Sequence, residues 1–166
     1  TALDVTSTGN ANLAGGTAND ISGTVTGSVT GTFSLNNANT TQTQLGNISA
    51  GNLTLTSTGN VTQAGSTSVN VSSGVTTVTA TGKNITLANT GNDFGTVVAT
   101  GNNVSIKDTV NGFTVGNVTA GNLTLNAAGN IGQSVGANIT TTALDVTSTG
   151  NANLAGGTAN DISGTV

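Results

Sequence analysis

The sequence predicts an all-β chain wound as a parallel β-solenoid. Three observations support this fold class: short segments in which apolar and small polar residues alternate, a regular interval between those segments, and Gly and Asn between them. Alternation with period two places alternate side chains on opposite faces of a strand. A regular recurrence is typical of coils that stack on one another. A sandwich or barrel of antiparallel hairpins would also use short strands, but it would not explain the self-similarity.

The alternation defines the expected strands and core. Its clearest segments are LTL at 53–55, VNV at 69–71, ITL at 85–87, VSI at 104–106, LTL at 123–125 and LDV at 144–146. The spacing of their starts predicts coils of about 16–21 residues. The expected core columns are Leu53, Leu55, Val69, Val71, Ile85, Leu87, Val104, Ile106, Leu123 and Leu125. The expected turn ladder is Asn52, Asn84, Asn103 and Asn122, because Asn suits turns.

A long duplication sets the domain organisation. The segment TALDVTSTGNANLAGGTANDISGTV at 1–25 returns unchanged at 142–166. This offset predicts that residues 1–141 form one repeat unit of about seven or eight coils, and that residues 142–166 begin the next identical unit. A single coil holds too few apolar side chains to offset the entropy of ordering its backbone. We therefore expect further copies of the repeat as partners, end to end along the axis.

Composition excludes several classes of protein. Thr, Asn and Gly number 35, 24 and 25 of the 166 residues, whereas Glu, Arg, His, Cys, Met, Trp, Tyr and Pro are absent. With two Lys and a net charge of -4, the chain has no basic patch for nucleic acid. It contains 38 Val, Ile, Leu and Phe residues, more than a disordered chain usually has. No apolar run is long enough for a signal peptide or a membrane span, so we expect no membrane insertion of this segment.

The residues that could carry chemistry are few. Without His, Cys, Glu or Arg, the usual nucleophile-base pairs and zinc sites cannot be assembled. Asp4 with Asp20, and Asp93 with Asp108, are each separated by about one coil, and stacked carboxylates could act on a polysaccharide. The simpler interpretation is that these are turn and solvent-facing residues. GNDFGTV at 91–97 lacks the pattern of a calcium-binding β-roll. We expect no catalytic, cofactor-binding or metal-binding residue, and therefore no enzyme.

Two outward patterns leave a binding function open. Asn-x-Ser/Thr, an acceptor pattern for N-glycosylation, occurs for example at Asn47, Asn52, Asn60, Asn70, Asn84, Asn103, Asn117, Asn122 and Asn138. Thr-x-Thr pairs such as Thr6 with Thr8, Thr54 with Thr56 and Thr77 with Thr79 could order water on a flat face. An ice-binding or glycan-binding solenoid face is therefore the alternative function, and a polysaccharide-acting β-helix enzyme is the third.

A resemblance to a known family adds to this interpretation. The phrases AGNLTLTSTGNVTQAGS, NITLANTGNDFGTVVATGNNVSIKD and VTAGNLTLNAAGNIGQS, over most of residues 50–134, resemble the repeats of filamentous-haemagglutinin-like bacterial adhesins. The resemblance implies a right-handed parallel β-helix, export by two-partner secretion or autotransport, and a place outside or on the surface of a Gram-negative cell. It also implies attachment to a host-cell, matrix or other cell-surface target, or biofilm formation. The sequence thus predicts a non-catalytic structural segment of a stiff extracellular fibre or adhesin stalk.

Overall fold

The chain folds into β-strands joined by turns. The computed structural model describes all residues 1–166 and contains fifteen strands, all paired in parallel, and no helix. The strands are β1 (Leu3–Ser7), β2 (Ala11–Leu13), β3 (Thr24–Asn37), β4 (Gln42–Ser57), β5 (Asn60–Gln63), β6 (Val69–Thr79), β7 (Ile85–Leu87), β8 (Asp93–Thr100), β9 (Asn103–Asp108), β10 (Phe113–Thr119), β11 (Asn122–Ala127), β12 (Ile131–Gln133), β13 (Ile139–Ser148), β14 (Ala152–Asn153) and β15 (Asp161–Thr165). An apolar helix of membrane-spanning length is accordingly not among its elements.

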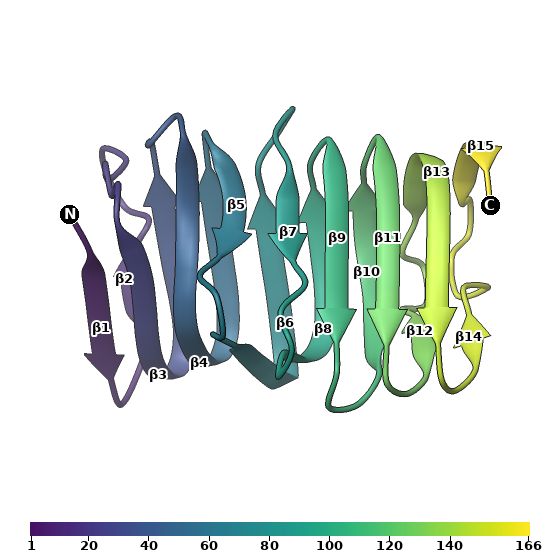
Figure 1. Ribbon diagram of the computed structural model, residues 1–166, viewed down its shortest axis with the longest axis horizontal. Helices are drawn as coiled ribbons and strands as arrows, with labels where there is room; N and C mark the ends of the chain where they lie inside the picture. Colours follow the sequence, from purple (N-terminus) through teal and green to yellow (C-terminus); the bar gives the residue numbers. More distant parts are fainter.

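The strands form a right-handed solenoid of about eight turns. In Figure 1 the chain advances from the N-terminus at the left to the C-terminus at the right. The near strands β9, β11 and β13 run downward, and the fainter strands behind them run upward, which is the sense of a right-handed coil. The expected fold class, an all-β right-handed parallel β-helix, is confirmed.

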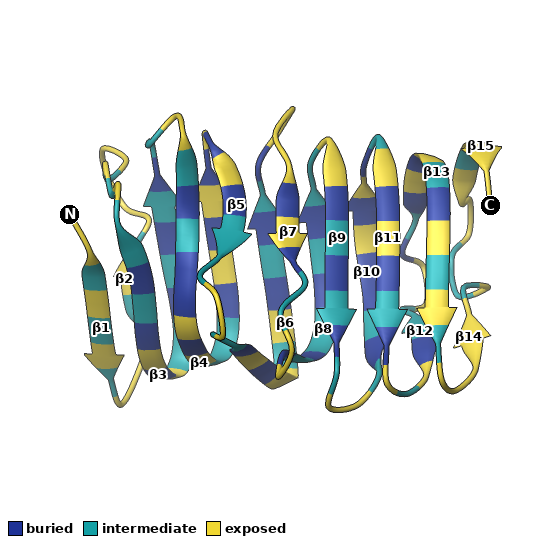
Figure 2. Ribbon diagram, in the orientation of Figure 1, coloured by how far each residue is buried: buried dark blue, intermediate teal, exposed yellow.

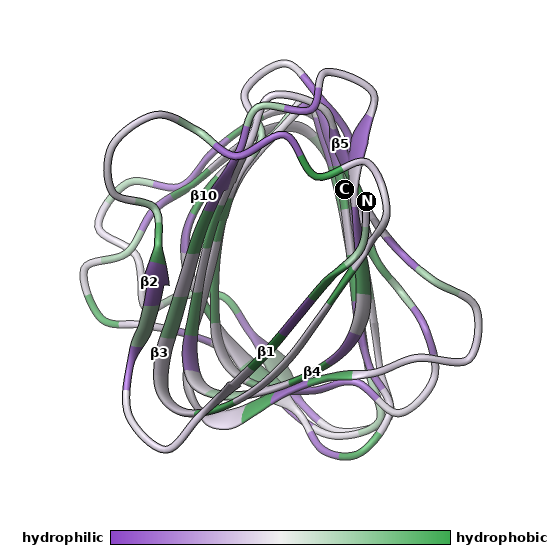
Figure 3. Cartoon of the chain, turned by 90° about the vertical axis from the view of Figure 1, so that its left-hand side faces the viewer, coloured by the Kyte–Doolittle hydropathy of each residue, from purple (hydrophilic) through white to green (hydrophobic).

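Long strands turn the corners of the coil. The first part of β3 pairs with β1, and its second part pairs with β2. The register between β3 and β4 shifts between Val29 and Thr32, where the chain bends from one side of the coil to the next. Such a bulge inserts an extra residue and redirects the strand. Figure 3, a view along the axis, shows the resulting closed cross-section with loops projecting outward from it.

The spacing of the coils differs in part from the expected one. Residues that stack in neighbouring coils are 18 to 24 positions apart in the sequence. Val97 and Val115 have the shortest of these separations, and Val61 and Ile85 have the longest. The shortest intervals in the sequence, from LTL at 53–55 to VNV at 69–71 and on to ITL at 85–87, do not separate stacked strands, because Leu53 stacks on Thr76 and Val69 stacks on Ile48. Each coil has inward-alternating segments on more than one side. Segments with similar sequences can therefore lie on different sides of the coil, and the distance between them in the sequence is then shorter than the length of one coil.

The core follows the predicted alternation. Thirty buried apolar side chains form one continuous cluster inside the coils, and Figure 2 shows buried and exposed residues alternating along the strands. The structure places all ten expected core residues in this cluster, each no more than 2% exposed: Leu53, Leu55, Val69, Val71, Ile85, Leu87, Val104, Ile106, Leu123 and Leu125. They belong to several columns, and Ile85, Val104, Leu123 and Leu144 stack in one of them.

One corner of the solenoid requires glycine. A Cβ atom on Gly95 would lie 2.6 Å from the carbonyl oxygen of Gly74, and one on Gly51 would lie 2.6 Å from the carbonyl oxygen of Thr30. A Cβ atom on Gly74 would collide with the carbonyl oxygen of Gly51. Backbones therefore approach one another at this corner more closely than any side chain allows.

Candidate functional site

Asparagine side chains connect successive coils at the turns. Asn84 Oδ1 accepts a hydrogen bond from the backbone N–H of Asn103 at 3.2 Å and from Asn103 Nδ2 at 2.9 Å. Asn122 Nδ2 then donates to Asn103 Oδ1 at 2.7 Å. Three of the four expected ladder residues thus form one continuous ladder. Asn52 lies at another corner, where its Oδ1 accepts the backbone N–H of Val75 at 2.9 Å.

A second inter-coil contact pairs glutamine with asparagine, and we call it the Gln–Asn clasp. Gln63 and Asn92 exchange two hydrogen bonds between their side-chain amides, at 2.8 and 2.9 Å. Gln133 and Asn160 make the same exchange at 2.7 and 3.0 Å. In each clasp the asparagine Oδ1 also accepts a backbone N–H from the first residue of a strand. Asn92 accepts it from Val69 of β6, and Asn160 accepts it from Ile139 of β13. The clasps close two equivalent loops of the solenoid.

Reasoning from sequence missed the clasps, although the sequence contains a signal for them. GNVTQ at 59–63 and GNIGQ at 129–133 share the Gly-Asn-aliphatic-x-Gln pattern, and each ends on a clasp glutamine. Their partners follow more than one coil later, at Asn92 and Asn160. Because coil lengths vary, this separation cannot be assigned to a contact before the register is known.

The duplicated segment adopts the same local structure at both ends. Three bonds that support its turns occur in both copies at nearly equal distances. The N–H of Gly9 donates to Ser7 Oγ at 3.2 Å, and that of Gly150 donates to Ser148 Oγ at 3.1 Å. The other two bonds are Ala14 N–H to Asn12 Oδ1 (3.0 Å; 3.1 Å for Ala155 and Asn153) and Asn19 Nδ2 to the carbonyl of Leu13 (2.7 Å; 2.8 Å for Asn160 and Leu154). The turns near Gly9 and Asn12 therefore keep their bonds in both copies, whereas the end of the segment differs: Asp161–Thr165 forms β15, but of the matching residues 20–24 only Thr24 belongs to a strand.

The two copies display opposite stacking surfaces of the same coil. In the first copy, Asn10 Oδ1 accepts the backbone N–H of Thr32 in the following coil at 2.8 Å. In the second copy, Asn151, which corresponds to Asn10, donates its backbone N–H to Asn130 Oδ1 in the preceding coil at 2.8 Å. One residue thus uses its backbone toward one neighbour and its side chain toward the other. Both contacts can form together.

The separation of the copies corresponds to seven coils. β14 contains Ala152 and Asn153, the copies of Ala11 and Asn12 in β2. Seven parallel pairings lead from β2 to β14, in the order β2–β3, β3–β4, β4–β6, β6–β8, β8–β10, β10–β12 and β12–β14. The register leads from Ala11 to Gln133, which lies one residue beyond the Gly132–Asn153 pair, so the duplicated segment recurs on the same side of the solenoid with a displacement of about two residues along the coil.

The first pair of aspartates considered for catalysis has structural partners. Asp4 Oδ1 accepts a hydrogen bond from Thr26 Oγ1 at 2.8 Å. Asp20 Oδ1 accepts one from Asn39 Nδ2 at 2.9 Å. Each carboxylate thus ties its own coil to a side chain of the following coil.

The second pair is divided between the inside and the outside of the coil. Asp108 is fully buried and accepts the backbone N–H groups of Phe94, Val110 and Asn111 at 2.8 to 2.9 Å. Asp93 lies on the outer surface, next to the inward Phe94. No three His, Cys, Asp or Glu side chains come together in the chain.

The outward threonines form a row, with few complete pairs. One position carries Thr in five successive coils: Thr56, Thr79, Thr100, Thr119 and Thr140. The position two residues earlier carries Thr54 and Thr77, which stack on each other, but the next coil places Val98 there. The Thr-x-Thr pair is therefore stacked in two adjacent coils here and is not continued in the third.

Several Asn-x-Ser/Thr sites are occupied by inter-coil bonds. The Oδ1 atoms of Asn47 and Asn117 accept the backbone N–H groups of Ser68 and Asn138, at 3.0 and 2.9 Å. Asn138 in turn accepts the N–H of Ala159 at 3.0 Å. These side chains have a structural role that accounts for the pattern without modification.

Comparison with known proteins finds a family of repeats that matches part of the chain. Residues 30–100, less than half of the chain, match a family model described as repeats of unknown function (DUF5649). The chain matches neither a curated protein nor a solved structure. The matched residues run from β3 to the end of β8 and so contain the glycine corner and the first clasp. The chain is thus a repetitive β-solenoid protein that is similar, over these coils, to repeats of unknown function.

Proposed function

We propose that the chain is a non-catalytic structural segment of a large secreted repetitive protein, and that its units continue end to end as a stiff extracellular fibre or adhesin stalk. One observation carries the proposal. The duplicated segment stacks on a following coil in its first copy and on a preceding coil in its second, and Asn10 and its copy Asn151 use different atoms for the two contacts. The unit at 1–141 can therefore be followed by an identical unit without a new type of interface.

The geometry supports a mechanical role. Parallel strands stack about 4.8 Å apart, so the seven coils between the copies rise about 34 Å. Hydrogen bonds run along the axis through the strands, the asparagine ladder and the clasps. A continuous core and axial hydrogen bonding resist bending and local opening. A rod of this kind can hold an adhesive tip away from a cell surface.

The resemblance to filamentous-haemagglutinin-like adhesins supports the biological setting. It is consistent with the repeat-family match and with the right-handed parallel coil. We place the protein outside or on the surface of a Gram-negative cell, where it serves attachment or biofilm formation. Its partners are further copies of its own repeat and a host-cell, matrix or other cell-surface target.

Arrays of defined length test the fibre. Proteins with one, two or four tandem copies of residues 1–141 are compared by small-angle scattering and negative-stain electron microscopy. In each protein only the last copy is followed by residues 142–166. We expect rods of constant width whose length increases by about 34 Å with each unit. Compact particles, or lengths that do not grow linearly, would contradict end-to-end continuation. Immunogold labelling of native cells tests the location, and label confined to the cell interior would overturn the extracellular setting.

A further inference from the structure

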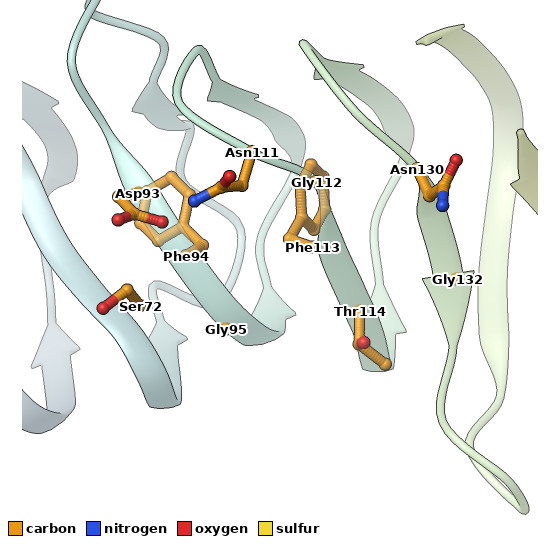
Figure 4. A pocket seen from close by; sticks show the side chains of 10 residues that line it. All are labelled: Ser72, Asp93, Phe94, Gly95, Asn111, Gly112, Phe113, Thr114, Asn130 and Gly132. Atoms are coloured by element: carbon orange, nitrogen blue, oxygen red, sulfur yellow. The ribbon is translucent and has the colours of Figure 1, made fainter. Parts of the chain in front are cut away.

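Two hollows lie on one outer side of the solenoid. The first has a volume of about 480 Å³ and lies over β8, β10 and β12. Figure 4 shows Asp93, Asn111 and Asn130 following one another from coil to coil along its upper side, with Ser72 and Thr114 below them. Gly132 leaves part of this space open, because a Cβ atom on it would meet no atom within 4 Å. The volume of the hollow is within the range of about 300–1,000 Å³ that is typical of ligand sites.

The second hollow continues the first along the axis. It also measures about 480 Å³ and is lined by Asp4, Ser28 and Ser49 from the first coils, together with Asn70 of β6. Asn70 and Ser72 are two residues apart on the outward side of β6, and Ser72 lines the first hollow. The two hollows therefore adjoin at β6, and we refer to them together as the axial groove. It crosses seven successive coils, which corresponds to about 29 Å between the outermost strands.

The charge of the groove excludes polyanions. Its lining contains the carboxylates of Asp4 and Asp93 and no basic side chain. The chain's two lysines, Lys83 and Lys107, are not part of it. A nucleic acid or a sulfated glycan would meet like charge here without a compensating cation.

The first hollow exposes more polar than apolar surface, and the second exposes the two about equally. The Phe94 and Phe113 side chains beneath the first hollow are only 1% and 4% exposed, because their rings pack edge to face inside the coil with centroids 6.4 Å apart. The accessible groups are hydroxyls, amides and the backbone at glycine. For example, Asn130 uses its Oδ1 for the inter-coil bond to Asn151, and Nδ2 remains for a ligand (Figure 4). Such groups recognise a ligand rich in hydroxyl groups.

We propose that this groove binds a neutral polysaccharide, which lies along the solenoid axis. A neutral glycan presents hydroxyl groups at regular intervals, and the groove presents amides and hydroxyls once per coil. Without an exposed aromatic platform, each sugar contributes little binding free energy, so affinity arises from several coils acting together. The inference does not depend on the proposed fibre, because the groove lies within a single chain.

A groove-filling variant provides the test. In Ser72→Val/Gly132→Val, two methyl-bearing side chains enter the first hollow; a Cβ atom on Gly132 meets no atom within 4 Å, and Ser72 is an exposed strand residue. The matched control, Thr56→Val/Thr119→Val, changes two outward residues of the threonine row, which does not line the groove. The probes are cellohexaose, maltohexaose and chitohexaose, with heparin as the anionic comparator. Binding to the ¹⁵N-labelled chain is followed by amide chemical shifts.

We expect at least one neutral hexasaccharide to give saturable shifts centred on the groove residues. The groove-filling variant should weaken this binding by about tenfold or more, and the control should stay within about twofold of the original chain. Shifts centred on another face, equal weakening by both variants, tighter binding of heparin, or no saturable shift with any of the three neutral probes would each overturn the proposal.

Discussion

Gln133 and Asn160 face each other across one turn of the solenoid and exchange two hydrogen bonds, at 2.7 and 3.0 Å. The same exchange joins Gln63 to Asn92, so the clasp occurs twice along the chain with the same chemistry. Asn160 is the second copy of Asn19. The clasp at the end of one unit therefore involves the first coil of the next, and an array of units would contain clasps both within units and across their junctions.

The two clasps should differ in their contribution to stability. Asn92 is fully buried, whereas Asn160 is exposed. Gln63→Leu removes two hydrogen bonds from a buried amide and should lower the free energy of unfolding by about 1–3 kcal/mol. Gln133→Leu leaves its partner in contact with water and should cost less than about 1 kcal/mol. Urea denaturation followed by circular dichroism measures both, and an equal cost for the two variants would contradict this assignment.

Removal of a buried hydroxyl should stabilise the protein at one position. Thr76 is fully buried, and its Oγ1 has no hydrogen-bond partner. Thr76→Val should raise the free energy of unfolding by about 1 kcal/mol, because an unpaired buried hydroxyl carries a desolvation cost.

Thr43 is the matched control for Thr76, since it is equally buried but bonds Asn37 Nδ2 at 2.9 Å and Ser57 Oγ at 2.7 Å. Thr43→Val should destabilise by about 1–3 kcal/mol. Thermal unfolding of both variants gives the sign directly. A loss of stability in Thr76→Val would indicate that its hydroxyl has a partner in solution.

The glycine corner should not tolerate a side chain. In Gly74→Ala the new methyl group would collide with the carbonyl oxygen of Gly51, so the strands must separate. We expect a loss of about 1–3 kcal/mol, as for other overpacked sites. Gly132→Ala is the control, because its methyl group would meet no atom within 4 Å. Equal denaturation midpoints for the two variants would show that the corner is not close-packed.

The carboxylate of Asp108 should be one of the most important side chains for stability. It accepts three backbone N–H groups inside the coil, and Asp108→Ala leaves all three without an acceptor. The expected loss is about 2–4 kcal/mol. Asp93→Ala on the outer surface should stay within about 0.5 kcal/mol of the original chain. Hydrogen exchange at Phe94, Val110 and Asn111 should accelerate only in the Asp108 variant.

The alternating pattern was sufficient to predict the fold class and the core. Ile85 and Leu87 point inward and Thr86 points outward, because successive side chains on a strand must face opposite sides. This rule is local, so it holds without knowledge of the neighbouring strands. The same reasoning placed Leu53 and Leu55 in the interior, where the structure has them.

The pattern was not sufficient to predict which strands stack. LTL at 53–55 and ITL at 85–87 have nearly the same letters but lie on different sides of the coil, and Asn52 and Asn84 accordingly occupy different corners. The lateral position depends on bulges and on loop lengths that vary between coils. The clasps escaped prediction for the same reason, since they join residues whose separation becomes meaningful only when the register is known.

The seven pairings between β2 and its copy in β14 have a consequence for any longer array. The register through these pairings displaces each copy by about two residues along the coil, so each unit is turned by a small constant angle in addition to the slow twist of stacked strands. Grooves, loops and threonine rows of successive units would then follow separate lines that wind slowly around the axis. A rod built from such units carries chemically distinct stripes along its whole length, so different stripes can meet different surroundings.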